Sequence, residues 1–288
     1  MLQNLNPVLG LHPSLLQSSS ADAAWRLAAG TMRVNRDLNP KRRFAVTFKH
    51  LGKLNPIDSS HLQNLISCFS ALADATSDCD APAVIGLAES GIVPSFAMHQ
   101  ACLEQGRSPR WFCTSRDDLG GLKFREPHSH APHHYLPANL FDDPIDELWI
   151  VEDEITTGRT VANLLRCIGL TEKVQRVRVF ALLDTRDANA AIGMRQIEVS
   201  AESVLRSCPN FWTESNPNLI SREFCDAPRQ LVIGESIAAA LPSLLSGALP
   251  RLQHVTLSPW LTDGCHIISR QEPMPGYYLY NADEPPRV

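Results

Sequence analysis

The sequence predicts an α/β protein, in which a mainly parallel sheet with flanking helices is followed by a smaller C-terminal α/β domain. Short apolar runs typical of buried strands alternate with segments whose apolar residues recur at helical spacing. Strands and helices that alternate at these lengths favour a parallel sheet covered on both faces. The chain of 288 residues also exceeds one average core, which favours two domains.

Five strands are expected before residue 190, because short runs of β-formers are bounded there by turn residues. They cover residues 43–48, 82–88, 110–115, 148–151 and 176–184. Helices alternate with them, because apolar residues recur there every three or four positions. They cover residues 21–30, 62–72, 93–105 and 161–168. Asp58 is a suitable N-cap for the second of these helices.

Beyond Arg186 the alternation weakens, and a second apolar group begins near Gln230. A helix is expected there from Glu235. Its apolar face carries Ile237, Leu241, Leu244, Leu245 and Ala248. Short strand candidates follow at residues 254–257, 265–269 and 277–280. We therefore expect one domain at residues 1–190 and a second at residues 191–288.

The composition is that of an ordinary soluble protein, with 44% hydrophobic and 20% charged residues. No apolar run approaches the roughly 18 residues of a membrane helix, and the N-terminus lacks the basic region and apolar core of a secretory signal. We expect a cytoplasmic location and no membrane partner. The net charge of −5 includes no large basic cluster, so nothing supports nucleic-acid binding. The eight cysteines lie far apart, which favours reduced thiols over disulfides.

The stretch LWIVEDEITTGRTVANLL, from Leu148, places a strand, three acids and a Thr/Gly turn ahead of a helix. Backbone N–H groups and hydroxyls in such a turn converge on an anion at the helix N-terminus. The residues of this 156–160 turn are Thr156, Thr157, Gly158, Arg159 and Thr160. Glu152 and Asp153 would repel a phosphate alone, but a ribose diol donates hydrogen bonds to carboxylates and Mg²⁺ supplies charge. The pattern therefore predicts a 5-phosphorylated sugar, the alternative being an ordinary strand, turn and helix with a capping Thr.

The order of apolar residues, E-D, two residues, T-T-G, any residue and T resembles the diphosphate-sugar signature of type I phosphoribosyltransferases. The resemblance implies that fold, the substrate 5-phosphoribosyl 1-diphosphate (PRPP), and a pyrophosphate loop after an earlier parallel strand. The stretch VIGLAESG, from Val84, supplies this 88–91 loop with Ala88, Glu89, Ser90 and Gly91. Small residues let the backbone approach an anion closely, and the following helix adds its N-terminus. Taken alone, the loop is equally compatible with a simple tight turn.

A third element is the 113–137 segment, CTSRDDLGGLKFREPHSHAPHHYLP, which is long, charged and rich in histidine. Gly120 and Gly121 are able to hinge it, as a lid that closes to exclude water requires. Its catalytic candidates are Arg116, Lys123, Glu126, His128 and His130. The first two are cations for a departing pyrophosphate, and His128 or His130 is a candidate for proton transfer. The alternatives are an inert solvated loop and a zinc site at His128, His130, His133 and His134.

The chain also resembles a narrower group, the orotate-phosphoribosyltransferase-like proteins associated with tellurite/stress-resistance gene clusters, which carry a C-terminal TRSP domain. The stretches NPKRRFAVTFKHLGK, VIGLAESG, FREPHSHAP and VEDEITTGRT carry the likeness between Asn39 and Asp184. The likeness is thinner in the second domain, and this chain has Leu257 where the group's naming motif has Arg. The sequence leaves open whether that domain covers the substrate or only stabilises the protein.

The resemblance implies a Mg²⁺-dependent enzyme that forms or cleaves an N-glycosidic bond between the sugar of PRPP and a nucleobase-like heterocycle. It assigns Glu152 and Asp153 to the ribose hydroxyls and makes them candidate Mg²⁺ ligands beside the bound PRPP. The 156–160 turn would hold the 5-phosphate and the 88–91 loop the pyrophosphate.

Thr156 is similar to the orotate type, since enzymes for 6-oxopurines have Asp there, so a 6-oxopurine acceptor is not expected. The alternative function is a non-catalytic sensor of nucleotide or PRPP on the same fold. A homodimer is compatible with the sequence, which does not fix the oligomeric state.

Overall fold

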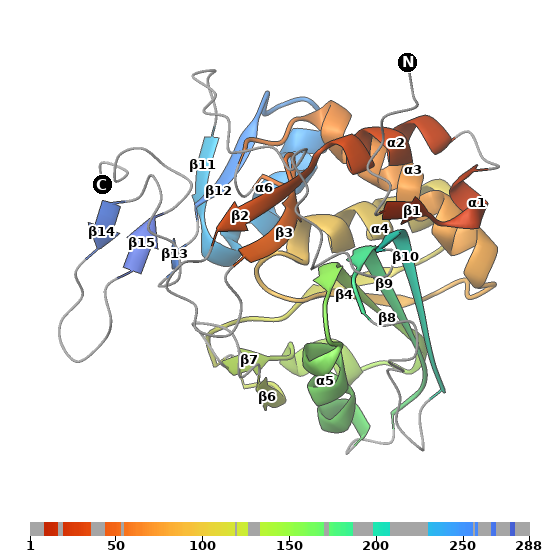
Figure 1. Cartoon of the computed structure of the whole chain (residues 1–288). Helices are drawn as coiled ribbons and strands as arrows, with labels where there is room; N and C mark the ends of the chain where they lie inside the picture. Colours follow the sequence, from red (N-terminus) through yellow and green to blue (C-terminus); the bar gives the residue numbers. More distant parts are fainter. Residues whose placement is uncertain are drawn as a thin grey trace. The chain divides into compact units, whose positions relative to one another are not determined.

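The chain forms two compact units that alternate along the sequence. The computed structural model describes residues 9–16, 20–35, 44–52, 55–118, 120–125, 133–169, 173–186, 198–207, 230–255, 257–258, 266–268 and 277–279 (Figure 1). The first unit comprises residues 1–29 and 63–215, and the second comprises residues 30–62 and 216–288. The second unit thus takes a segment from the N-terminal part of the chain, and the division into domains at residue 190 stays a prediction.

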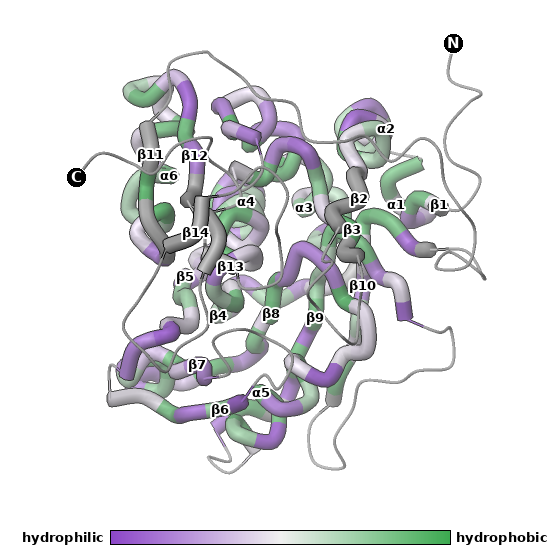
Figure 2. Tube along the Cα trace, turned by 60° about the vertical axis from the view of Figure 1, so that its left-hand side comes forward, coloured by the Kyte–Doolittle hydropathy of each residue, from purple (hydrophilic) through white to green (hydrophobic). Residues whose placement is uncertain are grey.

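The first unit is built on a six-stranded sheet with the strand order β1-β10-β9-β8-β4-β5 (Figure 2). In that order the strands are Leu9–Leu11, Glu198–Ser207, Val174–Asp184, Ile145–Ile155, Ala83–Gly86 and Arg110–Cys113. Neighbouring strands run parallel, except that β1 is antiparallel to β10. The expected α/β fold with a mainly parallel sheet is therefore confirmed.

The expected strands at residues 82–88, 110–115, 148–151 and 176–184 lie in this sheet as β4, β5, β8 and β9. Both β8 and β9 are 11 residues long, since β8 continues through charged residues on both sides of its apolar run and β9 begins two residues earlier than expected, at Val174. Strand β10 was not expected, since its sequence EVSAESVLRS has few apolar residues in succession. Its pairing with β9 supplies what local propensity lacks.

The expected strand at residues 43–48 forms as β3 (Phe44–Phe48), but it joins a different sheet. It pairs antiparallel with β2 (Thr31–Asn35), and both belong to the second unit. Strand propensity reports a pleated, partly buried backbone and does not say which partner the strand will find. Its place outside the central sheet is therefore a correction to the alternating pattern read from the sequence.

Helices cover both faces of the central sheet. Helix α4 (Ile92–Glu104) packs closely on one face, where a Cβ at Gly86 would overlap the hydroxyl of Ser95. Helix α5 (Arg159–Gly169) lies on the other face, and its Leu164 and Leu165 belong to the same buried cluster as Ile150 and Val179. In Figure 2 apolar residues are frequent along β4, β8 and β9, as a sheet covered on both faces requires.

Three more helices lie in the N-terminal part of the chain: α1 (Pro13–Leu16), α2 (Ala21–Ala29) and α3 (Ser59–Thr76). The predicted N-cap of α3 is confirmed, since Asp58 Oδ1 accepts the backbone N–H of His61 at 3.0 Å. No helix in the part of the chain that the structure describes is long and apolar enough to cross a membrane.

The described part of the second unit contains three small sheets: the antiparallel pair β2 and β3, a second pair that is parallel, and a three-stranded antiparallel sheet. The parallel pair is β11 (Gln230–Ile233) with β12 (Leu252–Val255), followed in the chain by β13 (Leu257–Ser258), β14 (His266–Ile268) and β15 (Tyr277–Leu279). After a 3₁₀ turn (Gly234–Ser236), helix α6 (Ile237–Leu245) buries Ile237, Leu241 and Leu244 as expected. The helix ends before Gly247, which has φ +77°, so Ala248 is exposed and not on its apolar face.

Candidate functional site

The carboxyl edge of the central sheet brings together the segments singled out in the sequence. Strand β8 lies between β4 and β9, with Val151 opposite Gly86 of β4 and Ile155 opposite Asp184 of β9. Glu152 and Asp153 stand at the end of β8, and the 88–91 loop follows the end of β4. Because parallel strands expose their carboxyl ends at one edge, these acids and the 88–91 loop are neighbours.

The 156–160 turn connects β8 to α5, as the motif predicted. Gly158 has φ +69°, a left-handed conformation that glycine adopts without strain. The helix begins at Arg159, and the carbonyl of Gly158 accepts the N–H of Ala162 at 2.9 Å. The first backbone N–H groups of α5 and its positive end therefore face this turn, as an anion site requires. Phosphate binding itself stays a prediction.

The acids of β8 are partly buried at the strand's end, and Glu154 contacts the next strand. Thr185, just after β9, donates its hydroxyl to Glu154 Oε1 at 3.5 Å, and its N–H reaches Ile155 O at 2.9 Å. Glu152 and Asp153 are also half-buried. The backbone that carries these three acids leads directly into the 156–160 turn.

The 88–91 loop leads from β4 into α4 and lies directly against β8. The N–H of Gly91 donates to Leu87 O at 2.9 Å, and the peptide bond between Ala88 and Glu89 is cis. A Cβ at Gly91 would lie 2.7 Å from both Leu87 N and Val151 O. Only glycine therefore lets the loop approach the end of β8 this closely.

Thr114, which follows β5, ties the 88–91 loop to the neighbouring strand. Its hydroxyl accepts the N–H of Ala88 at 2.8 Å, and its own N–H donates to Gly86 O at 2.9 Å. The side chain is almost fully buried, at 1% exposure. The same hydroxyl lies 3.2 Å from Nδ1 of His134, whose Nε2 contacts Nη1 of Arg116.

The described part of the 113–137 segment is a β-hairpin and not an irregular loop. Strands β6 (Lys123–Arg125) and β7 (His133–Tyr135) pair antiparallel, and Ser115 bridges to Tyr135. The hairpin is attached to α5, because Asn163 Nδ2 donates to Arg125 O at 2.7 Å and Cys167 Sγ lies 3.5 Å from Lys123 O. These bonds attach β6 to α5, and the lid role of the segment stays a prediction.

The candidates in the 113–137 segment lie in different places. Arg116 and the hairpin residue Lys123 are described, and the Lys123 ammonium lies 5.5 Å from the centre of the Tyr135 ring. Glu126, His128 and His130 lie outside the described residues. Gly120 has φ +80°, as a tight turn requires, whereas a Cβ at Gly121 would overlap the carbonyl of Leu136. Close packing therefore accounts for Gly121, and its proposed hinge role stays a prediction.

The described residues do not complete the alternative zinc site. Among them, no group of three or more His, Cys, Asp or Glu is placed to hold a metal ion. His133 is exposed and His134 is buried. The described cysteines are free thiols, and burial raises the pKa of Cys68 and of Cys102 to about 12.

A buried ion pair beside the 156–160 turn was not predicted from the sequence. Arg186 Nε donates to Asp184 Oδ1 at 2.9 Å, and Arg186 Nη2 donates to Asp184 Oδ2 at 2.7 Å. The pair stands at the end of β9, next to Ile155. An Asp and an Arg two residues apart at the end of a predicted strand were the available signal. This bidentate pair stands beside the start of the 156–160 turn, because Asp184 is opposite Ile155 in the sheet.

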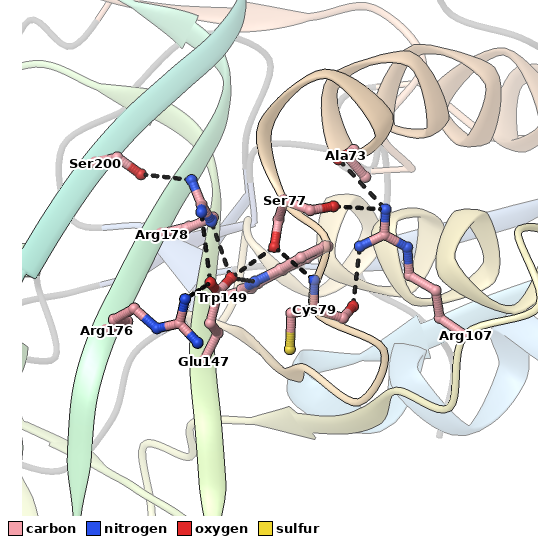
Figure 3. A network of polar contacts seen from close by, with 9 residues as sticks. All are labelled: Ala73, Ser77, Cys79, Arg107, Glu147, Trp149, Arg176, Arg178 and Ser200. Carbon is pink, nitrogen blue, oxygen red and sulfur yellow. Dashed lines mark hydrogen bonds and ion pairs between the residues drawn. The ribbon is translucent and has the colours of Figure 1, made fainter.

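A second polar cluster lies at the opposite end of β8 (Figure 3). Glu147 accepts hydrogen bonds on Oε2 from Ser77 Oγ at 2.8 Å, Trp149 Nε1 at 2.9 Å and Arg178 Nε at 2.9 Å. Arg176 Nη1 lies 3.2 Å from its Oε1. Burial alone would raise the pKa of Glu147, but the hydrogen bonds from Arg178, Trp149 and Ser77 hold it below its usual value.

The Glu147 cluster borders a polar cavity of about 390 Å³. Its wall includes Asp74, Ser77, Asp78, Cys79, Arg176 and Arg178. Arg178 also donates to Ser200 Oγ at 3.3 Å, which ties β9 to β10. Both carboxylate oxygens of Glu147 are bonded within the fold, so the cluster holds β8, β9 and the end of α3 together.

The family model described as phosphoribosyl transferase matches residues 32–208. Adenine phosphoribosyltransferase from Saccharomyces cerevisiae is 16% identical over 64% of this chain and 99% of its own, with a TM-score of 0.43. The Trypanosoma brucei enzyme, solved with AMP, pyrophosphate and ribose-5-phosphate, is 11% identical over 71% of this chain and 91% of its own, with a TM-score of 0.44.

A hypothetical protein from Neisseria gonorrhoeae with bound ppGpp is 13% identical over 49% of this chain and 77% of its own, with a TM-score of 0.33. A search of curated proteins found no match. Similarity at these identities and TM-scores identifies neither a substrate nor a mechanism.

Proposed function

We propose that this chain, which belongs to the phosphoribosyl transferase family, transfers the 5-phosphoribosyl group of PRPP to a nitrogen of a nucleobase-like heterocycle. The family match over residues 32–208 covers more than half of the chain, and the protein is a phosphoribosyltransferase enzyme. The observation that supports the substrate is the adjacency of three segments at one edge of the sheet. They are the acids of β8, the 156–160 turn and the 88–91 loop.

The acids at the end of β8 and the 156–160 turn that follows them suit a sugar phosphate. The backbone N–H groups at the start of α5, with the hydroxyls of Thr156, Thr157 and Thr160, would donate to the 5-phosphate. Glu152 and Asp153 stand before the turn and would accept hydrogen bonds from the 2- and 3-hydroxyls of the ribose. The acids and the turn thus follow one another along the chain, as the hydroxyls and the 5-phosphate do along the ribose.

The 88–91 loop lies beside the end of β8, where the diphosphate on C1 of the same sugar would reach. In the transfer, the C1–O bond breaks and both electrons leave with the pyrophosphate oxygen. The lone pair of a ring nitrogen of the heterocycle then forms the C1–N bond, and the positive charge on C1 resembles that in glycoside cleavage. Glu152 and Asp153 would stabilise this charge, and Arg116 and Lys123 the charge on pyrophosphate.

The proton of the heterocyclic nitrogen must also be accepted. His128 and His130 stay the candidates for this step, because imidazole accepts protons near neutral pH. They belong to the 113–137 segment, whose described hairpin is attached to the helix that follows the 156–160 turn.

The acids of β8 fit a Mg²⁺ ion that arrives with the diphosphate. Mg²⁺ is usually held by one or two carboxylates together with substrate phosphates and water. Glu152 and Asp153, half-buried at the end of β8, offer two such carboxylates. When bound, the ion would neutralise charge on the diphosphate.

The acceptor and the narrower family stay predictions. Thr156 favours an orotate-like acceptor over a 6-oxopurine, as the resemblance implies. The tellurite/stress-resistance group and the TRSP domain rest on the sequence alone, and Leu257, in place of the group's Arg, pairs with Leu279 in the second unit. The cytoplasmic location and a homodimer are likewise proposals.

The test is a pyrophosphate-release assay on the full chain with PRPP, Mg²⁺ and a panel of bases that includes orotate, adenine and hypoxanthine. We expect release with at least one base, and loss of release in Asp153→Asn. Asp143→Asn is the matched control, because this carboxylate is exposed near the other end of β8. No release with any base, together with tight nucleotide binding, would instead identify a sensor.

A further inference from the structure

The buried imidazole of His134 joins two parts of the proposed site that are distant in the sequence. Its side chain is 1% exposed and stands on β7, opposite Phe124 of β6. Nδ1 lies 3.2 Å from the hydroxyl of Thr114, and Nε2 contacts Nη1 of Arg116. Since Thr114 holds the N–H of Ala88, one ring connects Arg116 to the 88–91 loop.

We propose that His134 is a positioning residue that sets Arg116 and the 88–91 loop for the diphosphate of PRPP. It acts through these two groups and does not itself contact the reacting atoms. The proposal rests on the function proposed above, because it assigns the 88–91 loop and Arg116 to the diphosphate end of that substrate.

The chemistry of Arg116 decides which ring nitrogen of His134 carries the proton. A guanidinium has only N–H donors, so Nε2 must be the bare, accepting nitrogen. The neutral ring therefore carries its proton on Nδ1 and donates it to Thr114 Oγ1. That oxygen has two lone pairs, so it accepts from both His134 and the N–H of Ala88. The chain of bonds is consistent in this one tautomer.

Packing holds the ring in the plane that these bonds need. The rings of Phe124 and His134 are stacked, with centroids 4.8 Å apart and an interplanar angle of 20°. Phe124 is itself 5% exposed, and it belongs to the buried cluster that includes residues of β8 and α5. A fixed ring between fixed partners is what preorganisation of a charged site requires.

The position of the His134 ring also makes strand β7 part of the proposed site. Arg116 follows β5, the 88–91 loop follows β4, and His134 returns from the far end of the 113–137 segment. Without the ring, the Arg116 guanidinium would lose its contact with Nε2 and the Thr114 hydroxyl its bond to Nδ1, so only the backbone would connect the two side chains. The diphosphate would then have to order them as it binds, which weakens its binding.

The variants separate the two bonds from the packing. His134→Phe keeps the stacking on Phe124 and removes both ring nitrogens. His134→Gln offers an acceptor near the position of Nε2 and is the conservative rescue. Thr114→Val removes the hydroxyl that links the ring to Ala88, and Thr114→Ser restores it. Each variant is compared with wild type by thermal unfolding, so that a variant that does not fold is recognised and the other pair decides.

The ligands separate a positioning role from a general structural one. PRPP and ribose 5-phosphate, each with Mg²⁺, share the sugar and the 5-phosphate but differ in the diphosphate. Titration calorimetry on the full chain should show PRPP affinity about tenfold or more lower in His134→Phe and in Thr114→Val. Ribose 5-phosphate affinity should stay within about twofold, and His134→Gln and Thr114→Ser should retain most PRPP affinity.

The outcomes keep the two proposals apart. If wild type binds PRPP but both removal variants bind it equally well, or lose both ligands to the same degree, His134 has no positioning role. If wild type binds neither PRPP nor ribose 5-phosphate, the proposed function itself is wrong. Selective loss of PRPP in the removal variants, with rescue by Gln and Ser, supports the positioning role.

Discussion

Strand β8 carries acids at both ends, and the two ends use them differently. Near the amino end, Glu147 is 1% exposed and bonded to Ser77, Trp149 and two arginines of β9. At the carboxyl end, Glu152 and Asp153 are half-buried beside a turn and a helix N-terminus. Acidic residues thus cross-link strands at one edge of the sheet and stand beside the proposed ligand site at the other.

The difference follows from the geometry of parallel strands. The segments that leave the carboxyl ends carry backbone N–H groups at the starts of α4 and α5, which attract anions. At the amino edge, Ser77 and Cys79 follow the end of α3, whose carbonyls are bound by Arg107 (Figure 3). In this sheet the Glu147 cluster therefore lies at the amino edge, whereas the proposed ligand site lies at the carboxyl edge, where the Asp184–Arg186 ion pair also stands.

The largest effect on stability is expected from a substitution at the amino end of β8. Glu147→Gln removes a buried charge that faces Arg178, which is half-buried, and Arg176, which is exposed, so the free energy of unfolding should fall by about 3 kcal/mol, the lower end for a buried ion pair. Urea denaturation measures it, with Glu154→Gln on the same strand as control, expected to change stability by under about 1 kcal/mol. Equal effects of the two substitutions would refute the contrast between the ends.

The next effect concerns the carboxyl end. Asp153→Asn should lower PRPP affinity by about 1.5–3 kcal/mol, since it removes a charged acceptor for the ribose hydroxyls. Its free energy of unfolding should change by under about 1 kcal/mol, the reverse of the Glu147 result. Calorimetric titration with PRPP and Mg²⁺ measures the affinity. Unchanged affinity would mean that the acids of β8 do not hold the sugar.

A smaller effect is expected from a substitution in the 156–160 turn. Gly158→Ala forces an L side chain into φ +69°, which should cost about 1–2 kcal/mol of stability and also weaken PRPP binding. Gly106→Ala is the matched control, because Gly106 has φ +76° and open space around a Cβ, and it lies in the turn after α4. It should lose similar stability and keep PRPP affinity. Loss of affinity in both variants would point to general destabilisation.

The smallest effect is a difference in pH dependence. The folded pKa of Glu147 is held below its unfolded value of about 4.5, so its contribution is complete above that pH and is lost as pH falls through the folded pKa. Wild type should therefore lose stability on acidification more steeply than Glu147→Gln, by at most about 1.4 kcal/mol per pH unit. Urea denaturation between pH 3 and 6 measures both slopes. Parallel curves would show that the partners of Glu147 do not lower its pKa in the folded protein.

Much of the carboxyl edge could be predicted because its signals are local. The strand, acids, turn and helix from Leu148 to Leu165 are consecutive, and periodicity and glycine chemistry report directly on such neighbours. The Glu147 cluster could not be predicted, because the bond to Arg178 depends on the register of β8 with β9. Thr114 and His134 are 20 residues apart and meet only because β7 folds back along Ser115.

Hydrogen–deuterium exchange with and without PRPP and Mg²⁺ tests most directly whether the carboxyl edge of the sheet is the ligand site. We expect slower exchange in peptides covering the 88–91 loop and the 156–160 turn. Peptides covering residues 74–79 and 145–149, at the Glu147 end, should be unchanged. Protection confined to the Glu147 end, or no protection at the carboxyl edge at saturating PRPP, would contradict it.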